Sequence, residues 1–253
     1  MAKKFQVVTR STPIREHPDH FSTLTSELLY GETVETISHH GNFLKCININ
    51  DGYEGYVIKE ALSDDILTPN KKIVRMHSFV YSDPDFRTPT ITYLSFLSAI
   101  TTTGNTENGF SEIEGGGWLW SDDLAPMEHK AKNITTTAQM FLNLPYLWGG
   151  KTSRGVDCSG LVQLALHHAG QTCPRDSGDQ EFEIHGTNVE FGNEYTPTNL
   201  QKGDIVFFKG HVGIMMDEDN IINATARTMD VRIEKLSDIT KFYEGGVTKV
   251  TRL

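Results

Sequence analysis

Basic residues are few in this sequence. Its 253 residues include 23 Lys and Arg against 33 Asp and Glu, which gives a formal net charge of -10. Nucleic-acid backbones and anionic lipid headgroups are bound by clustered Lys and Arg side chains. The charge balance therefore argues against nucleic acid and against an anionic membrane surface as partners.

Long hydrophobic runs are also missing. No stretch approaches the ~20 apolar residues of a transmembrane helix. The two lysines near the N-terminus are not followed by the apolar segment of a signal peptide. We therefore expect a globular protein of the cytoplasm.

Cysteine is scarce as well. Cys46, Cys158 and Cys173 are odd in number and lack the spacing of a disulfide framework, so reduced thiols are expected. The histidines have no metal-ligand spacing with these cysteines. We expect neither a metal nor an organic cofactor.

The N-terminal half contains short alternating segments of strand type, separated by turn sequences such as Tyr30-Gly31-Glu32. Residues 1–66 are predicted to form a small SH3-like β-barrel. Residues 67–127 repeat the theme, and their segment 114–120 (EGGGWLW) corresponds to 51–57 (DGYEGYV) in the first half. We predict two tandem barrels.

The period of the apolar residues changes after residue 128. Helical spacing is present over 130–142 and 158–169, and strand-like segments follow at 204–208, 211–216, 221–226 and 231–235. Helices followed by a strand meander indicate an α+β domain over residues 128–253.

Cys158 lies where a Gly-rich loop meets the start of a predicted helix. The helix dipole and free backbone N–H groups at that point favour a thiolate. Its neighbours Asp157 and Ser159 are polar, unlike the apolar surroundings of a structural cysteine. Cys158 is therefore the candidate nucleophile, whereas Cys46 and Cys173 are interpreted as structural.

His211 begins an apolar strand in the sequence KGHVGI and is the candidate base, with a simple turn histidine as the alternative. Gly213 leaves room for a close backbone approach. Asn223 lies on a following apolar strand, where a buried amide needs a hydrogen-bond partner. Its oxygen can accept a hydrogen bond from the imidazole, which predicts a Cys-His-Asn arrangement for nucleophilic catalysis.

Four motifs stand in order after residue 128: PYLWGG, DCSGLV, GDIVFF and HVGI. In these motifs the segment resembles the NlpC family of papain-like bacterial cell-wall cysteine peptidases. The two barrels resemble the bacterial SH3-like domains of its γ-D-glutamyl-L-diamino acid endopeptidases. The third catalytic residue of the family is most often histidine, whereas Asn223 stands there in this chain.

The resemblance implies a papain-like domain that hydrolyses the bond between γ-D-Glu and a diamino acid in peptidoglycan peptides with a free N-terminal L-Ala. The expected role is recycling of cell-wall peptides, with such a muropeptide as the partner. Which diamino acid is preferred, the oligomeric state and the role of the second barrel stay open.

The resemblance also implies roles for individual residues. Cys158, His211 and Asn223 are the implied catalytic residues. The implied substrate contacts are Asp176 with the L-Ala ammonium, Ser177 with the dipeptide, Asp157 and Ser159 with D-Glu, Tyr146 at the oxyanion, Trp148 in the cleft wall, and Tyr53 or Tyr56 at the amine end.

Several of these residues could have a structural role instead of a functional one. Tyr146 and Trp148 could be core aromatics, and Asp176 could be a turn former. At the level of function, the alternatives are a non-catalytic wall-peptide-binding protein with a decayed site, and an acyltransferase or amidase on the same scaffold.

Overall fold

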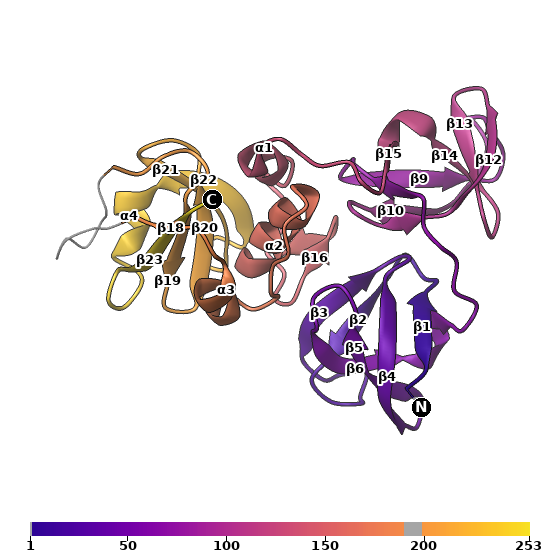
Figure 1. The fold of residues 1–253 in the computed structure, drawn as a ribbon, viewed down its shortest axis with the longest axis horizontal. Coiled ribbons are helices and arrows are strands. Elements are labelled where there is room, and N and C mark those ends of the chain that lie inside the picture. The colour runs from indigo at the N-terminus through magenta and orange to yellow at the C-terminus, as the bar shows by residue number, and fades with distance from the viewer. Residues whose placement is uncertain (1, 190–198) are drawn as a thin grey trace. The chain divides into compact units, whose positions relative to one another are not determined.

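The computed structural model describes residues 2–189 and 199–253. The chain forms two compact units, Met1–His129 and Lys130–Leu253, which are drawn in Figure 1. Within the described residues, we find no helix that is long and apolar enough to span a membrane. The predicted boundaries near residues 66 and 127 stay predictions.

The first part of the N-terminal unit is a seven-stranded sheet. Its strands are β1 (Lys4–Val7), β2 (Ser11–Arg15), β3 (Leu24–Leu29), β4 (Thr33–His40), β5 (Phe43–Asn48), β6 (Glu54–Ile58) and β7 (Leu62–Ser63), with a 3-10 turn η1 (Lys59–Ala61) before β7. Neighbouring strands are antiparallel, in the order β3-β2-β6-β5-β4-β1-β7. Alternate side chains from these strands form a core around Leu28, Val34 and Val57.

The second part of this unit contains a five-stranded and a three-stranded sheet. Their strands are β8 (Lys71–Ile73), β9 (His77–Tyr81), β10 (Thr90–Ser95), β11 (Ala99–Ile100), β12 (Thr102–Glu107), β13 (Phe110–Ile113), β14 (Trp118–Trp120) and β15 (Leu124–Pro126), with a 3-10 turn η2 (Ser121–Asp123). The orders are β10-β9-β14-β13-β12 and β11-β8-β15.

The strand orders of the two parts correspond. If β8 is matched to β1 and β9 to β2, then β10, β13, β14 and β15 match β3, β5, β6 and β7 in sequence and in position. The pair β11 and β12 together replaces β4, and η2 stands where η1 stands. The same topology recurs along the chain, as a tandem repeat requires.

The C-terminal unit combines helices with a six-stranded antiparallel sheet and a short two-stranded one. The helices are α1 (Ile134–Gln139), α2 (Cys158–His168), α3 (Ser177–Glu183) and α4 (Leu236–Thr240). The strands are β16 (Lys151–Thr152), β17 (Gly155–Val156), β18 (Thr187–Asn188), β19 (Ile205–Phe208), β20 (His211–Met215), β21 (Asn220–Thr225), β22 (Asp230–Lys235) and β23 (Val247–Arg252). The order β18-β23-β19-β20-β21-β22 makes a six-stranded sheet, and β16 pairs with β17.

Helix α1 is shorter than the sequence pattern predicts. The Asn133 side chain accepts a hydrogen bond from the Thr135 N–H at 2.9 Å and so starts the helix there, not at residue 130. Helix α2 begins at Cys158, as predicted, and ends at His168. The predicted α+β class is confirmed.

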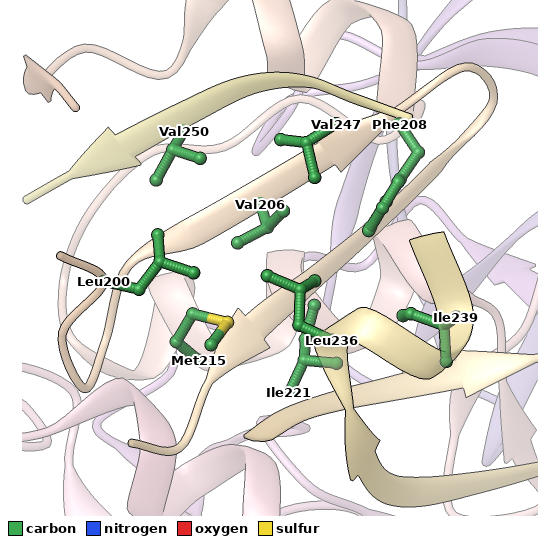
Figure 2. Close-up of a cluster of buried hydrophobic side chains, with 9 residues drawn as sticks. All are labelled: Leu200, Val206, Phe208, Met215, Ile221, Leu236, Ile239, Val247 and Val250. Carbon is green, nitrogen blue, oxygen red and sulfur yellow. The ribbon is translucent and has the colours of Figure 1, made fainter. Parts of the chain in front are cut away.

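The central strands of the sheet are buried on both faces. Every residue of β19 and β20 is buried, so their sequences are apolar runs instead of alternating ones. Helix α2 contacts β20 and β21, and Figure 1 shows α4 on the opposite side of the sheet. Figure 2 shows Leu236 and Ile239 of α4 in one cluster with Val206 and Met215 of the sheet. Helix α2 therefore packs against β20, which carries His211, and β21, which carries Asn223.

Candidate active site

Asp157 organises the loop that leads into α2. One of its carboxylate oxygens accepts a hydrogen bond from the Gly160 N–H at 2.7 Å, which caps the helix. The other accepts from the Gly149 N–H at 2.8 Å. Cys158 is therefore held as the first residue of the helix by a carboxylate that also ties back the Gly-rich loop.

Arg175 completes this arrangement from the loop before α3. Its guanidinium contacts both oxygens of Asp157, at 2.9 and 2.7 Å, and donates to the Ser159 hydroxyl at 2.8 Å. The Arg175 side chain is 1% exposed and that of Asp157 is 10% exposed. This buried bidentate ion pair, together with the hydrogen bond to Ser159, holds both residues adjacent to Cys158 in place. The sequence analysis assigns no role to Arg175.

Cys158 itself is buried, with 8% of its surface exposed. Burial raises the pKa of its thiol to about 12, and the negative charge of Asp157 adds to this rise. Hydrogen bonds from the backbone N–H groups of Val212 and Ser159 oppose it but are outweighed. Desolvation therefore opposes the thiolate that the helix start favours.

His211 and Asn223 meet as the sequence predicts. The His211 Nε2 atom lies 3.0 Å from Asn223 Oδ1, and both residues are buried. Burial lowers the pKa of His211 to about 4, against the raising effect of the Asn223 hydrogen bond. The Cys158 sulfur accepts a hydrogen bond from the backbone N–H of Val212, the residue after His211. The thiol therefore lies at the start of β20, the strand that carries His211.

The predicted close approach at Gly213 is found on the neighbouring strand. A Cβ atom there would lie 2.7 Å from Ile221 Cδ1 and 2.9 Å from the Ile222 carbonyl oxygen. The small residue lets β21 pack tightly against β20, and β21 carries Asn223.

Tyr243 covers the imidazole. Its ring is stacked on that of His211, with centroids 4.7 Å apart and an interplanar angle of 10°. Phe208 packs against Tyr243 in turn, at 4.6 Å. Hydrogen bonds join the Tyr243 hydroxyl to Arg227 and Thr225. The sequence analysis missed Tyr243, which lies after α4 and outside every motif.

Two aromatic residues of the Gly-rich loop have different environments. Tyr146 is half-buried, and burial together with the nearby Cys158 raises the pKa of its hydroxyl, which places Tyr146 near the nucleophile. Its proposed contact with the oxyanion stays a prediction. Trp148 is 65% exposed, so it is not a core residue. Its predicted place in a cleft wall is not tested.

The loop predicted to bind substrate precedes and begins α3. Asp176 is exposed at the N-cap position, and Ser177 is the first helical residue. Gln180 of the same helix donates to the Ser159 carbonyl oxygen at 2.9 Å. Helix α3 is thus bound to the residue that follows Cys158. The predicted contacts of Asp176, Ser177 and Ser159 with substrate stay predictions.

Tyr53 and Tyr56 belong to the N-terminal unit. Tyr53 packs against the core of the first sheet, and the Tyr56 ring contacts that of His40 edge-on at 5.0 Å. Their predicted place at the amine end of the site stays a prediction. Among the described residues, no group of three or more His, Cys, Asp or Glu could hold a metal ion.

Two segments of the chain match known protein families. Residues 143–250 match the NlpC/P60 family, and residues 14–62 match the bacterial dipeptidyl-peptidase SH3 domain. Dipeptidyl-peptidase 6 of Lysinibacillus sphaericus is 29% identical, over 94% of this chain and 93% of its own length. A γ-D-glutamyl-L-lysine dipeptidyl-peptidase of Bacillus subtilis is 26% identical, over 91% of this chain and 81% of its own length.

A solved structure has the same fold. The NlpC/P60 family protein from Bacillus cereus superimposes with a TM-score of 0.81 over 99% of each chain, at 21% identity. The sheet, the nucleophile helix and the two matched segments lead to one conclusion. Residues 143–250 of the chain are an NlpC/P60 cysteine peptidase domain, and residues 14–62 ahead of it are a bacterial SH3 domain.

Proposed function

We propose that this peptidase hydrolyses the bond between γ-D-Glu and a diamino acid in peptidoglycan-derived peptides whose N-terminal L-Ala is free. The observation that carries the catalytic part is the 3.0 Å contact between His211 Nε2 and Asn223 Oδ1. The sulfur of Cys158, at the start of α2, accepts a hydrogen bond from the N–H of Val212, the residue after His211. The bond specificity is supported by the names of the two relatives that match most of the chain.

Burial of both groups favours a neutral thiol and a neutral imidazole before substrate binds. We therefore assign His211 the role of general base at the moment of attack. The Cys158 sulfur bonds to the γ-carbonyl carbon of D-Glu while its proton moves to His211 Nδ1. The backbone N–H of Cys158 and the Tyr146 hydroxyl stabilise the oxyanion.

The intermediate then collapses with cleavage of the C–N bond. His211 gives its proton to the leaving amine of the diamino acid, and a thioester to Cys158 remains. A water molecule next attacks the thioester carbon and transfers a proton to His211. Cleavage of the C–S bond releases L-Ala-γ-D-Glu, and the proton returns to the sulfur.

Selectivity for a free amine is assigned to Asp176. Its carboxylate is exposed at the start of α3, a helix bound to the Ser159 carbonyl through Gln180. An ammonium group of L-Ala can pair with this carboxylate, whereas an acylated nitrogen carries no charge. In intact peptidoglycan the L-Ala nitrogen is acylated, so this site selects released peptides. Recycling of such peptides in the cytoplasm is the role that we propose.

The test uses purified protein with L-Ala-γ-D-Glu-meso-diaminopimelate, its L-Lys counterpart and the N-acetylated forms. Mass spectrometry should detect L-Ala-γ-D-Glu from the free peptides, no N-acetyl-L-Ala-γ-D-Glu from the acetylated ones, and neither product with Cys158→Ala. Asp176→Asn should slow cleavage of the free peptides and narrow the preference over the acetylated ones. Cleavage of both forms by the wild type would remove the amine selectivity but leave the peptidase.

Two further results would contradict the proposed peptidase activity or the proposed recycling role. Binding of the peptides without cleavage of any of them would support the wall-peptide-binding alternative. Recovery of the protein outside the cytoplasm in cell fractionation would remove the recycling role.

A further inference from the structure

A hydrogen-bond chain continues beyond Asn223. The Asn223 amide nitrogen donates to Glu234 Oε1 at 3.0 Å, and Asn223 is fully buried. Arg227 donates to the same oxygen of Glu234 and is also hydrogen-bonded to the Tyr243 hydroxyl. The chain of contacts therefore runs from His211 through Asn223 and Glu234 to Arg227.

Strand pairing explains why Glu234 reaches Asn223. Strands β21 and β22 are antiparallel, with Ile221 opposite Glu234 and Asn223 opposite Arg232. Side chains of such pairs share a face of the sheet, and diagonal neighbours lie within reach of a long side chain. The guanidinium of Arg232 is engaged by Asp230, so the diagonal residue Glu234 binds the amide.

The chemistry of Glu234 decides which way the amide faces. The two ends of a carboxamide have nearly the same shape, but one donates and the other accepts hydrogen bonds. An ionised carboxylate only accepts. The Asn223 nitrogen must therefore face Glu234, and the Asn223 oxygen must face His211.

The orientation of Asn223 in turn selects the tautomer of His211. An oxygen facing Nε2 requires a proton on Nε2 and leaves Nδ1 free to accept a proton. A rotated amide would present its N–H groups to Nε2, and the proton of the neutral ring would then reside on Nδ1. In that tautomer the basic nitrogen is Nε2, which faces Asn223, so Nδ1 cannot receive the Cys158 proton.

We propose that Glu234, held by Arg227, is a positioning residue that fixes the Asn223 amide and thereby the catalytically competent tautomer of His211. The inference rests on the roles proposed above for Cys158, His211 and Asn223. It gives a reason why asparagine serves as the third residue here: its one correct orientation is enforced from β22.

The first experiment measures kcat and KM on L-Ala-γ-D-Glu-diamino acid peptides. Glu234→Ala should lower kcat about three- to tenfold, the range of one hydrogen bond, with little change in KM. Glu234→Gln keeps an acceptor oxygen and should recover part of the loss. Arg232→Gln is the matched control, because it breaks a more exposed ion pair on the same strand and should behave as wild type.

Testing Glu234→Ala in the Asn223→Asp variant distinguishes an effect on the orientation of residue 223 from a general loss of stability. Asp in place of Asn223 has two equivalent oxygens and needs no orienting partner. In Asn223→Asp, the further change Glu234→Ala should therefore cause no loss and should relieve repulsion between two carboxylates. An equal loss of kcat from Glu234→Ala in both backgrounds would overturn the inference.

A readout without substrate keeps the two proposals distinguishable. The rate of Cys158 alkylation by iodoacetamide, followed by peptide mass spectrometry, depends on proton transfer to His211. It should fall in Glu234→Ala and not in Arg232→Gln. An inactive wild type with this alkylation pattern would contradict the proposed substrate and keep the positioning role. Wild-type kcat and alkylation in Glu234→Ala would contradict the positioning role alone.

Discussion

The Tyr243 ring lies parallel to the His211 imidazole at a centroid distance of 4.7 Å, and the Phe208 ring packs against Tyr243. Stacking of this kind contributes about 0.5–1.5 kcal/mol beyond burial. It also keeps water from one face of a ring whose pKa is lowered by burial. Tyr243 therefore limits both the rotation and the hydration of the proposed base.

Replacing Tyr243 should separate its ring from its hydroxyl. Tyr243→Phe keeps the stacked ring and should retain most of kcat. Tyr243→Ala exposes the imidazole and should lower kcat about tenfold, the equivalent of ~1.4 kcal/mol. Steady-state kinetics of both variants checks this. Equal kcat values for the two variants would mean that stacking has no part in the reaction.

The Arg175–Asp157 pair should dominate the stability of the nucleophile loop. Removing one partner of a buried ion pair leaves an uncompensated charge and costs about 3–5 kcal/mol. Arg175→Met should therefore lower the free energy of unfolding by that order. Arg175→Lys should also destabilise, because an ammonium cannot bind both carboxylate oxygens as the guanidinium does.

Urea denaturation of these variants is the measurement, with Arg232→Gln as control. The Arg232–Asp230 pair has side chains that are 39% and 28% exposed, so its loss should cost under about 1 kcal/mol. Similar losses for Arg175→Met and Arg232→Gln would contradict the view that the buried clamp holds the loop.

Burial of His211 predicts a pH dependence of stability. Its pKa is about 4 in the folded protein, whereas an unfolded chain has a histidine pKa of ~6.5. Between these values the unfolded state binds more protons, so the free energy of unfolding rises with pH. The stability associated with a neutral His211 is complete above pH ~6.5 and is lost as the pH falls toward 4.

Urea titrations of wild type and His211→Gln between pH 4 and 7.5 test this dependence. The wild type should lose more stability than the variant on acidification, by an amount on the order of 3 kcal/mol. Carboxylates that titrate in the same range affect both proteins and cancel in the difference. If the free energy of unfolding of both proteins changes with pH in the same way, protonation of His211 does not destabilise the folded state.

Sequence periodicity predicts most of the elements that position the site. The segments predicted as strands at 204–208, 211–216, 221–226 and 231–235 agree to within one residue at each end with β19, β20, β21 and β22, and α2 begins where predicted. Helix α4 and strand β23 are missed; α4 has five residues, too short for a helical period to be visible. The Gly-rich loop is predicted as a loop, but its anchoring through Arg175 is not.

The pairing of His211 with Asn223 is predictable, because a buried amide needs a partner and few candidates follow the histidine. Glu234 and Tyr243 are not, since strand pairing and the turn after α4 bring them to the site. The alternation of Asp230, Arg232 and Glu234 along β22 is a usable signal, as it puts charges on the face that carries Asn223. The pKa of Cys158 depends on burial, which motifs do not reveal.

Gly160 lies in the first turn of α2 and packs closely against the Gly150 carbonyl group. A Cβ atom at this position would lie 2.4 Å from the Gly150 carbonyl oxygen and 3.0 Å from Asp157 Oδ1. The carbonyl cannot withdraw easily, because Asp157 ties the adjacent Gly149 to the helix. Gly160→Ala should therefore cost about 1–3 kcal/mol of stability and lower kcat by displacing Cys158.

Gly178→Ala provides the matched control for the stability measurement. Gly178 is also in a helix, α3, but a Cβ atom there has no neighbour within 4 Å. Because alanine favours helix over glycine by up to about 1 kcal/mol, this variant should be as stable as wild type or more so. Thermal denaturation should lower the Tm of Gly160→Ala alone. If both variants keep the wild-type Tm, the loop can yield at Gly150, and the close packing there does not fix the position of the nucleophile.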